Sequence, residues 1–154
     1  MRLTLQTDLS LRVVMYIGAS GSARCTIHEI AKAYAVSENH LMKIVHRMTL
    51  LGYLETTRGR TGGIRLSPDT LSTQLGDFIL KMEPDFDYVP CLQYGEDCII
   101  KKCCILKSAI QEAHEAYIES LNRYQLSDLL SHTSKLVKAL HLTQEPTLRN
   151  LVLP

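Results

Sequence analysis

The sequence predicts a mainly α-helical chain with a small β-hairpin, namely a winged helix-turn-helix domain followed by a long helix suited to dimerisation. Three observations predict this class. Two short amphipathic helices separated by a tight turn fall between residues 26 and 51. A hairpin rich in glycine and arginine follows them directly. Beyond residue 104, one apolar stripe continues for about five helical turns.

Length and composition are those of a small globular protein. The chain has 154 residues, of which 45% are hydrophobic and 21% are charged, so it can bury one ordinary core. No apolar run approaches the roughly 20 residues that cross a bilayer. The N-terminal stretch carries Asp8 and Arg12 and is a poor signal peptide. We therefore expect a cytoplasmic protein with no membrane partner.

The two halves of the chain differ in charge. Residues 1–66 hold nine Lys and Arg against four Asp and Glu, a net charge of +5, whereas the rest holds eight against twelve, a net of −4. A basic half suits a polyanionic partner, and an acidic half limits indiscriminate binding. Many soluble proteins have such a lopsided charge, so this observation supports a nucleic-acid partner only together with the motifs below.

The first three predicted helices each carry an apolar face. Thr4 or Thr7 caps the first helix, and the glycine- and serine-rich residues 18–22 end it. The second helix spans about residues 26–34, and the third follows the N-cap Ser37. The apolar positions recur at three- and four-residue steps. They are Leu9, Val13, Tyr16 and Ile17 in the first helix, Ile27, Ile30, Ala31 and Tyr34 in the second, and Leu41, Ile44, Val45, Met48 and Leu51 in the third.

The second and third helices fit a helix-turn-helix, although an ordinary helical bundle with a solvated polar face would show the same pattern. The next residues favour DNA binding. Residues 52–56 and 64–66 are predicted strands, and the turn between them holds two arginines and three glycines. Glycines let the backbone lie close to a phosphate or enter a narrow groove, where arginines find negative potential. The hairpin is therefore predicted to be a wing.

Roles in DNA binding are assigned by chemistry. The first two turns of the third helix are the part that reaches base edges in a major groove, and the wing arginines suit phosphates or the minor groove. Glu38 opposes uniform phosphate affinity and suits a cytosine amino group instead. Arg65 is expected on its strand, facing solvent or the backbone. The candidate DNA-binding residues are Ser37, Asn39, His40, Lys43, Arg58 and Arg60.

Helical patterns return after the wing. A helix is predicted from Leu71 to Met82, ended by Pro84. The stripe of the long helix needs a cover, for which we favour a twofold-related copy over the chain's own N-terminal domain. Ser127 is a plausible N-cap for a last amphipathic segment that ends near Leu140. The stripe comprises Leu106, Ile110, Ala113, Tyr117, Leu121 and Tyr124.

These patterns predict four parts of the chain. Residues 1–82 form the winged helix-turn-helix domain, and residues 83–104 form a cysteine-rich loop. Residues 105–140 hold the dimerisation helix and the C-terminal helix. The tail, residues 141–154, has no clear pattern and is expected to be mobile.

The cysteine-rich loop holds four of the five cysteines of the chain. A cytoplasmic location argues against structural disulfides. Cys91 and Cys98 are separated by six residues, and Cys98 and Cys104 by five. These gaps are wider than in the Cys-x2-Cys pairs of zinc knuckles and suit a larger metal centre that contains several metal ions. We favour an iron–sulfur cluster, and structural zinc remains the alternative.

The other cysteines have different expected roles. Cys25 precedes the second helix and is predicted to be a small buried apolar residue. Cys103 and Cys104 are adjacent, and a redox enzyme with a vicinal dithiol is a further alternative. No nucleophile–base pair or phosphate loop stands out in the sequence, so we predict that the protein is not an enzyme.

Several separate motifs resemble one known family, the winged-helix iron–sulfur transcriptional regulators of the NsrR and IscR type. The resemblance covers roughly residues 1–130 and is strongest to the nitric-oxide-sensing NsrR branch. It rests on the first helix, the third helix (the DNA-recognition helix, here called the reader helix), the wing, the segment before the cysteines and two segments after them. These motifs are RLTLQTDLSLRVVMY, SENHLMKIV, RGRTGGIRL, GDFILKMEP, CCILKSAI and NRYQLSDLL.

The resemblance implies three cysteine ligands, Cys91, Cys98 and Cys104, for a [4Fe-4S] cluster, with [2Fe-2S] as the alternative. In the IscR branch a histidine lies three residues beyond the third cysteine, where this chain has Lys107. In NsrR-type members the fourth ligand resembles an aspartate of the opening helix, here Asp8, reaching the cluster of the partner subunit. Asp8 has another interpretation, as a favourable acid at a helix N-terminus and a partner of Arg12.

Together, these observations predict a homodimeric repressor that binds double-stranded operator DNA and senses nitric oxide through the cluster. Sensing of iron–sulfur or iron status, or of redox state, is the alternative within the same family. A zinc-stapled DNA-binding module without sensing is the alternative outside it. The sequence departs from the family pattern in the additional Cys103 and in Glu38, which stands where a basic residue is frequent.

Overall fold

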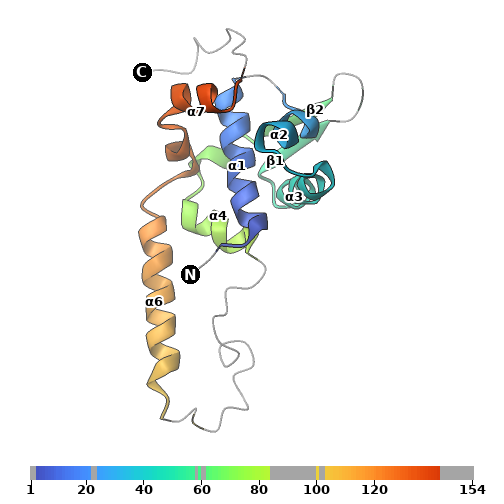
Figure 1. Cartoon of the computed structure of the whole chain (residues 1–154). Helices are drawn as coiled ribbons and strands as arrows, with labels where there is room; N and C mark the ends of the chain where they lie inside the picture. The colour runs from blue at the N-terminus through green and yellow to red at the C-terminus, as the bar shows by residue number, and fades with distance from the viewer. Residues whose placement is uncertain are drawn as a thin grey trace.

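The computed structural model describes residues 3–21, 24–57, 59, 62–83, 100 and 103–142 (Figure 1). Within them, helices predominate and one antiparallel hairpin is present, as the predicted fold class requires. None of the helices in this described part is both long and apolar enough to span a bilayer. The elements in order are α1 (Leu5–Ser20), α2 (Ile27–Tyr34), α3 (Glu38–Leu50), β1 (Leu54–Thr57), β2 (Gly63–Leu66), the 3₁₀ helix η1 (Thr70–Ser72), α4 (Leu75–Met82), α6 (Ile105–Leu121), the 3₁₀ helix η2 (Leu126–Leu130) and α7 (Thr133–Ala139).

The helix α1 lies at the centre of the body, between the α2–α3 pair with its hairpin on one side and α4 and α7 on the other (Figure 1). Thr4 is its N-cap, because the Thr4 side chain accepts a hydrogen bond from the Thr7 amide. The predicted apolar face is buried, and Val13 and Val14 have no exposed surface. Burial of this kind stabilises by roughly 1.5–3 kcal/mol per large aliphatic side chain.

The end of α1 falls within the predicted glycine- and serine-rich stretch, but only after Ser20. Gly18 belongs to the helix, and Gly21 terminates it with a left-handed φ of 63°. A Cβ at Gly18 would meet the side chain of Leu130, so this glycine allows α1 to approach η2 closely. The packing, rather than the intrinsic propensity of glycine, determines that the helix continues through this position.

The helices α2 and α3 have the predicted bounds to within one residue. A capping box joins Thr26 and Glu29 at the start of α2, and Ala35 turns the chain in the left-handed region with φ of 52°. The inner face of α3 is buried as predicted, except for Leu51, which lies just beyond the helix and keeps 39% of its surface exposed. The prediction for Leu51 was wrong because the chain leaves the helix before completing that turn.

The hairpin pairs Leu54 with Leu66 and Thr57 with Gly63. Cys25 adds a bridge to it, with backbone hydrogen bonds of 2.9 and 2.7 Å exchanged with Ile64. The prediction that Cys25 is buried is confirmed, since only 2% of its surface is exposed. This bridge joins the segment before α2 to the second strand and so holds the hairpin against the helix-turn-helix.

The predicted helix from residue 71 to residue 82 is not continuous. The structure has η1, then an extended connection, then α4. Residues 73–75 hydrogen-bond to the segment after α6: the Leu75 amide donates to the Tyr124 carbonyl at 2.8 Å, and the Leu126 amide donates to the Thr73 carbonyl at 2.9 Å. These long-range hydrogen bonds take the place of a helical turn. Their partners lie far apart in the sequence, so the local apolar periodicity does not predict them.

The helix α6 extends away from the body, and its N-terminal end lies farthest from it (Figure 1). Most of its predicted stripe is exposed or half-buried, and Leu106 is 58% exposed. Tyr124 lies beyond the end of α6, so its assignment to the stripe was wrong. Ser127 is not a helix N-cap either, because it lies inside η2, whose backbone follows the bridge between Gln74 and Gln125.

Two helical glycines give a stability test. A Cβ at Gly76 would clash with the Asn122 side chain and lie 2.8 Å from the Ile118 carbonyl oxygen. Asn122 is itself held by hydrogen bonds of 3.1 and 2.9 Å to Asp77. We expect Gly76→Ala to lower the free energy of unfolding by about 1–3 kcal/mol, measured by urea denaturation, because neither neighbour can move away.

Gly18→Ala is the matched control. Its added methyl meets only the flexible end of Leu130, and alanine favours a helix over glycine by roughly 1 kcal/mol. We therefore expect a change of less than about 1 kcal/mol in this variant. Equal destabilisation by the two substitutions would contradict the assignment of Gly76 as the rigid contact between α4 and α6.

Candidate nucleic-acid interface and cluster ligands

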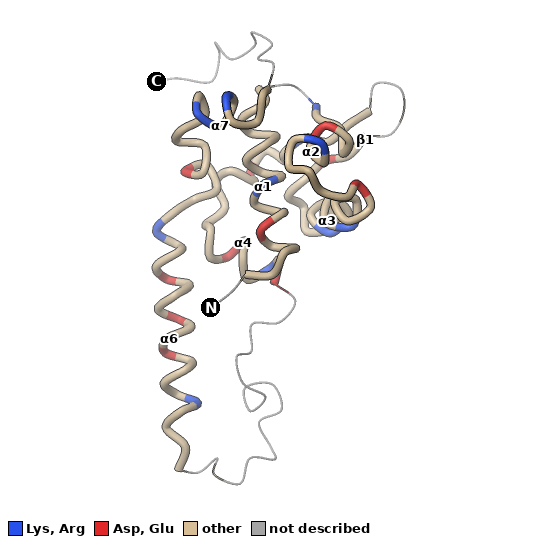
Figure 2. The backbone as a smooth tube through the Cα atoms, in the orientation of Figure 1, with Lys and Arg blue, Asp and Glu red and all other residues tan. Residues whose placement is uncertain are grey.

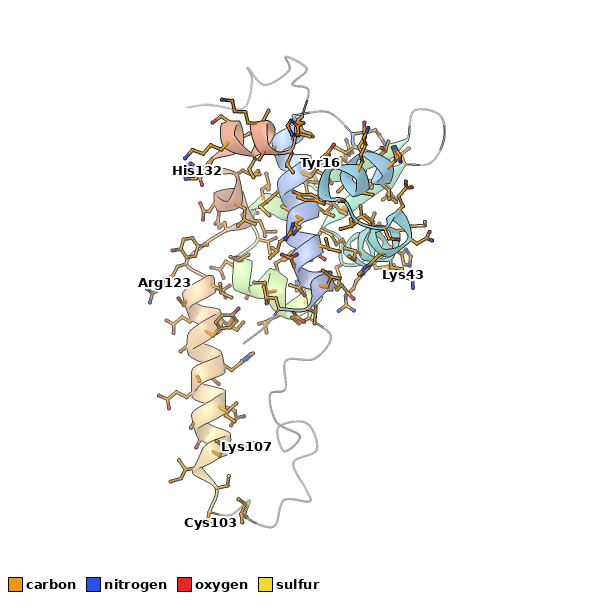
Figure 3. All side chains as sticks on the ribbon, in the orientation of Figure 1. Tyr16, Lys43, Cys103, Lys107, Arg123 and His132 are labelled. Atoms are coloured by element: carbon orange, nitrogen blue, oxygen red, sulfur yellow. The ribbon has the colours of Figure 1, made fainter. Side chains whose placement is uncertain are left out.

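The outer side of α3 is the candidate DNA-reading surface. Its buried face packs into the core, so its polar residues are directed outward. Ser37, Asn39 and Lys43 are exposed and His40 is half-buried. Figure 3 shows Lys43 at the outer edge of the helix-turn-helix, away from α1 and α6. The first two turns of α3 therefore carry hydrogen-bonding groups on the outer face of the helix, where they are exposed or half-buried.

The wing is partly described. Arg58 and Arg60, the predicted phosphate or minor-groove contacts, lie outside the described residues. Arg65 is on β2 and exposed, as predicted, and forms an ion pair with Glu55 across the hairpin. Gly59 has a φ of 108°, a conformation that favours glycine. The two paired strands are those of the hairpin predicted as a wing.

Asp8 lies in the first turn of α1 and keeps 44% of its side chain exposed. Its Oδ2 accepts a hydrogen bond from Arg12 Nε at 2.8 Å, which is the i,i+4 pair that the sequence allowed. Among the described residues, Oδ1 of Asp8 has no hydrogen-bond partner. The carboxylate therefore has one oxygen engaged with Arg12 and one directed to solvent.

Arg12 also connects Asp8 to the helix-turn-helix. Its guanidinium lies over the ring of Tyr34, 5.6 Å from the centroid. The Tyr34 hydroxyl in turn donates to the Arg12 carbonyl at 3.1 Å. Burial raises the pKa of Tyr34 to about 12, against the opposite effect of Arg12, so this hydroxyl remains a donor at neutral pH. Sequence reasoning found Arg12 by its spacing but gave Tyr34 only a core role.

A second connection joins α3 to the segment that precedes the cysteines. Arg47 on α3 is half-buried, and its Nη2 donates to the Lys81 carbonyl at 3.0 Å. Next to it, the buried Glu83 accepts from the Thr4 amide at 2.8 Å. The C-terminal end of α4 thus contacts both the reader helix and the start of α1. No local sequence pattern indicates either contact.

The described cysteines of the candidate cluster site lie at the N-terminal end of α6. Cys104 is the N-cap residue of that helix and is half-buried, and Cys103 is exposed. Cys91 and Cys98 lie outside the described residues. Within the described part of the chain, no three Cys, His, Asp or Glu side chains converge in a geometry that would hold a metal ion.

The described residues fit an iron–sulfur ligand set in their chemistry. Cys104 has its thiol at a helix N-terminus, where negative charge is favoured, and Asp8 has an accessible carboxylate oxygen. Figure 3 shows Cys103, the neighbour of Cys104, at the end of α6 that is far from α1. Within one chain, α1 and this end of α6 are therefore separate, and a shared site would use two chains.

These features define a winged helix-turn-helix transcriptional regulator: a polar reader helix, a hairpin beside it and a long helix leading away. The chain belongs to the Rrf2 family, described as iron-dependent transcriptional regulators, whose family model matches residues 3–132.

Related proteins agree with this membership. The chain is 40% identical over 146 residues to the HTH-type transcriptional regulator NsrR of Bacillus subtilis, covering 94% of this chain and all of that protein. It is 39% identical over 138 residues to NsrR of Geobacillus kaustophilus, with 88% and 94% covered. It is also 40% identical over 131 residues to the protein aau3 of Rhizobium meliloti, with 84% and 85% covered.

Solved structures share the fold at low sequence identity. The T. potens IscR structure superposes with a TM-score of 0.67 at 18% identity, covering 94% of each chain. The structure of CymR, the global cysteine regulator of B. subtilis, superposes with a TM-score of 0.65 at 22% identity, covering 86% of this chain and 98% of that one. These likenesses confirm the winged-helix architecture with its long helix.

The Tyr34 contact predicts a pH-dependent stability difference. Tyr34→Phe removes the hydroxyl that donates to Arg12 and should lower the free energy of unfolding at pH 8 by about 1 kcal/mol. The folded pKa is raised to about 12 from 10.0, so the stabilisation is complete below pH 10 and is lost as pH rises toward 12. Urea denaturation at pH 8 and at pH 11 measures both effects.

The difference between wild type and Tyr34→Phe should therefore shrink at the higher pH. Burial also raises the pKa of Tyr16 and of Tyr53. Both tyrosines remain in the variant, so they cancel in the comparison. A difference that stays constant from pH 8 to pH 11 would contradict the assigned role of Tyr34.

Proposed function

We propose that the protein is a homodimeric repressor that binds a palindromic operator and releases it when nitric oxide reacts with an iron–sulfur cluster. One observation carries the proposal: Asp8, the expected cluster ligand, contacts the helix-turn-helix through Arg12 and Tyr34. The near full-length similarity to proteins named NsrR supports it. The protein would act in the cytoplasm, where its DNA partner lies.

Cys91, Cys98 and Cys104 of one chain, with Asp8 of the other, would hold the cluster, [4Fe-4S] in the first instance and [2Fe-2S] as the alternative. When bound, the cluster supplies iron that reacts with nitric oxide, which the protein side chains alone do not provide. A carboxylate oxygen is a poorer iron–sulfur ligand than a thiolate and is the more easily displaced. Asp8 is thus the ligand suited to respond to a signal.

Asp8 would transmit that response through its neighbours. Its carboxylate positions Arg12, and Arg12 lies over the ring of Tyr34 near the C-terminal end of α2. The tight turn at Ala35 then leads directly into α3. A change in what Asp8 binds would alter the contact between the Arg12 guanidinium and the Tyr34 ring. The helices α1 and α3 would then shift together, and the fit of α3 to its operator would change.

The DNA contacts follow from the exposed side of α3 and from the wing. Ser37, Asn39, His40 and Lys43 would contact base edges and the adjacent backbone in the major groove. Arg58 and Arg60 would contact phosphates or the minor groove. A twofold-symmetric dimer would place two copies of this surface on two half-sites of a palindrome.

A different signal would use the same framework. A sensor of iron–sulfur status, iron or redox state would bind the same kind of operator and would be indifferent to nitric oxide. A zinc-stapled module would bind DNA without sensing. These candidates share the reader surface and differ in what the cysteines hold, so the metal content and the response to nitric oxide distinguish them.

The test follows colour and DNA binding together. Protein purified without oxygen should show the broad visible absorption of an iron–sulfur cluster, and additions of nitric oxide should bleach it while bound operator DNA is released. A colourless protein with stoichiometric zinc that still binds DNA would contradict the cluster. A coloured protein that keeps its operator through complete bleaching would contradict the nitric-oxide response.

The adjacent cysteines supply a matched pair of variants. Cys104→Ala should remove the visible absorption, whereas Cys103→Ala should retain it, because Cys103 is exposed and bonds only weakly, from its Sγ to the Ile100 carbonyl at 3.4 Å. Iron and sulfide content measure the outcome independently of DNA binding. The reverse pattern would exchange the roles of the two cysteines.

The dimer is tested on the stripe of α6. Ile110 is half-buried on the stripe and Ser108 is exposed on the opposite face of the same helix. We expect Ile110→Glu to convert a dimer to a monomer in sedimentation velocity, since a charge would be buried without a partner. Ser108→Glu adds the same charge and should leave the dimer intact.

Both variants should keep the helical circular dichroism of the wild type, because the single chain buries little of this stripe. An Ile110→Glu protein that remains dimeric at micromolar concentration would contradict α6 as the dimer seam.

A further inference from the structure

The first turn of α3 carries a side-chain contact to α2 that involves none of the candidate DNA-binding residues. Glu38 is the first residue of α3, and its Oε1 lies 2.8 Å from Nδ1 of His28 on α2. Both side chains are open to solvent, with 53% of Glu38 and 71% of His28 exposed. Figure 2 shows acidic and basic segments on α3, with the basic ones on the side of the helix away from α2.

Glu38 differs in its role from the other acidic residue of the helix-turn-helix. Glu29 caps its own helix, with its Oε2 accepting from the Thr26 amide at 2.7 Å. Glu38 contributes no capping bond to α3, and the N-cap Ser37 makes no side-chain cap bond either. No capping hydrogen bond of α3 therefore depends on the carboxylate at position 38.

A carboxylate at the leading end of a reader helix weakens affinity for phosphates unless it accepts a hydrogen bond from a base. In the major groove, the exocyclic amino group of cytosine is the donor that suits a carboxylate. His28 holds one oxygen of Glu38, and the other oxygen has no partner among the described residues. A carboxylate held in this way loses less side-chain entropy on binding than a free one.

We propose that Glu38 is a specificity-determining residue that accepts a hydrogen bond from a cytosine amino group in each half-site, and that His28 is the residue that positions it. The inference rests on the proposed function, since it requires that α3 enter the major groove of an operator. It adds a base identity and names the residue on α2 that supports the contact.

The test begins with the wild-type protein, purified without oxygen and offered a library of random double-stranded DNA. Sequencing of the selected fragments defines the preferred half-site and tests operator binding by itself. Affinities are then measured for duplexes that carry each of the four base pairs at each position of the half-site. We expect one position at which wild type prefers cytosine by roughly tenfold or more.

Three variants distinguish a base contact from a general charge effect. Glu38→Ala should lose the preference for cytosine at that position and keep the preferences elsewhere. His28→Ala should reduce the same preference, because the carboxylate remains but is no longer held. Glu55→Ala is the matched control: Glu55 is a half-buried glutamate that pairs with Arg65 across the hairpin. It should change affinity for all sequences alike.

The outcomes separate the inference from the proposed function. If wild type selects no sequence from the library, the proposed function fails. If wild type selects a site and Glu38→Ala shows the same base preference at every position, the role of Glu38 is overturned while operator binding stands. If Glu38→Ala loses the cytosine preference and His28→Ala keeps it as in the wild type, the positioning role of His28 is overturned while the role of Glu38 stands. Circular dichroism of each variant confirms that its fold is intact.

Discussion

Burial of α1 at the centre of the body is the constraint on which the rest of the structure depends. The helix contacts α3, β2, α4, η2 and α7, and Val13 and Val14 in its middle turns have no exposed surface. The position of α1 therefore fixes where the inner face of α3 lies and leaves the polar face of α3 outward. Asp8 lies in the first turn of α1, where 44% of its side chain is exposed.

That arrangement turns a local ion pair into a connection across the molecule. Asp8 contacts Arg12, Arg12 contacts Tyr34, and Tyr34 ends the first helix of the helix-turn-helix. The second connection, from Arg47 to the Lys81 carbonyl, approaches α3 from the segment that leads to the cysteines. One set of contacts thus joins Asp8 to the last residue of α2, and the other joins α3 to the C-terminal end of α4.

Interactions that stabilise this body are mostly short-range and apolar, and its exposed ion pairs add little. The Asp8–Arg12, His28–Glu38 and Glu55–Arg65 pairs are all substantially exposed, and such pairs contribute about 0–1 kcal/mol. Their value is positional: each fixes the direction of a charged side chain at the edge of a helix or of the wing.

Local sequence determined the helix-turn-helix, because capping residues, three- and four-residue apolar steps and turn chemistry act within a few residues. The cap at Thr4 or Thr7, the hairpin glycines and the Asp8–Arg12 spacing could be assigned this way. Tertiary structure decided the rest. The break before α4, the place of Ser127 and the partners of Arg47 and His28 depend on residues ten or more positions away, which periodicity does not register.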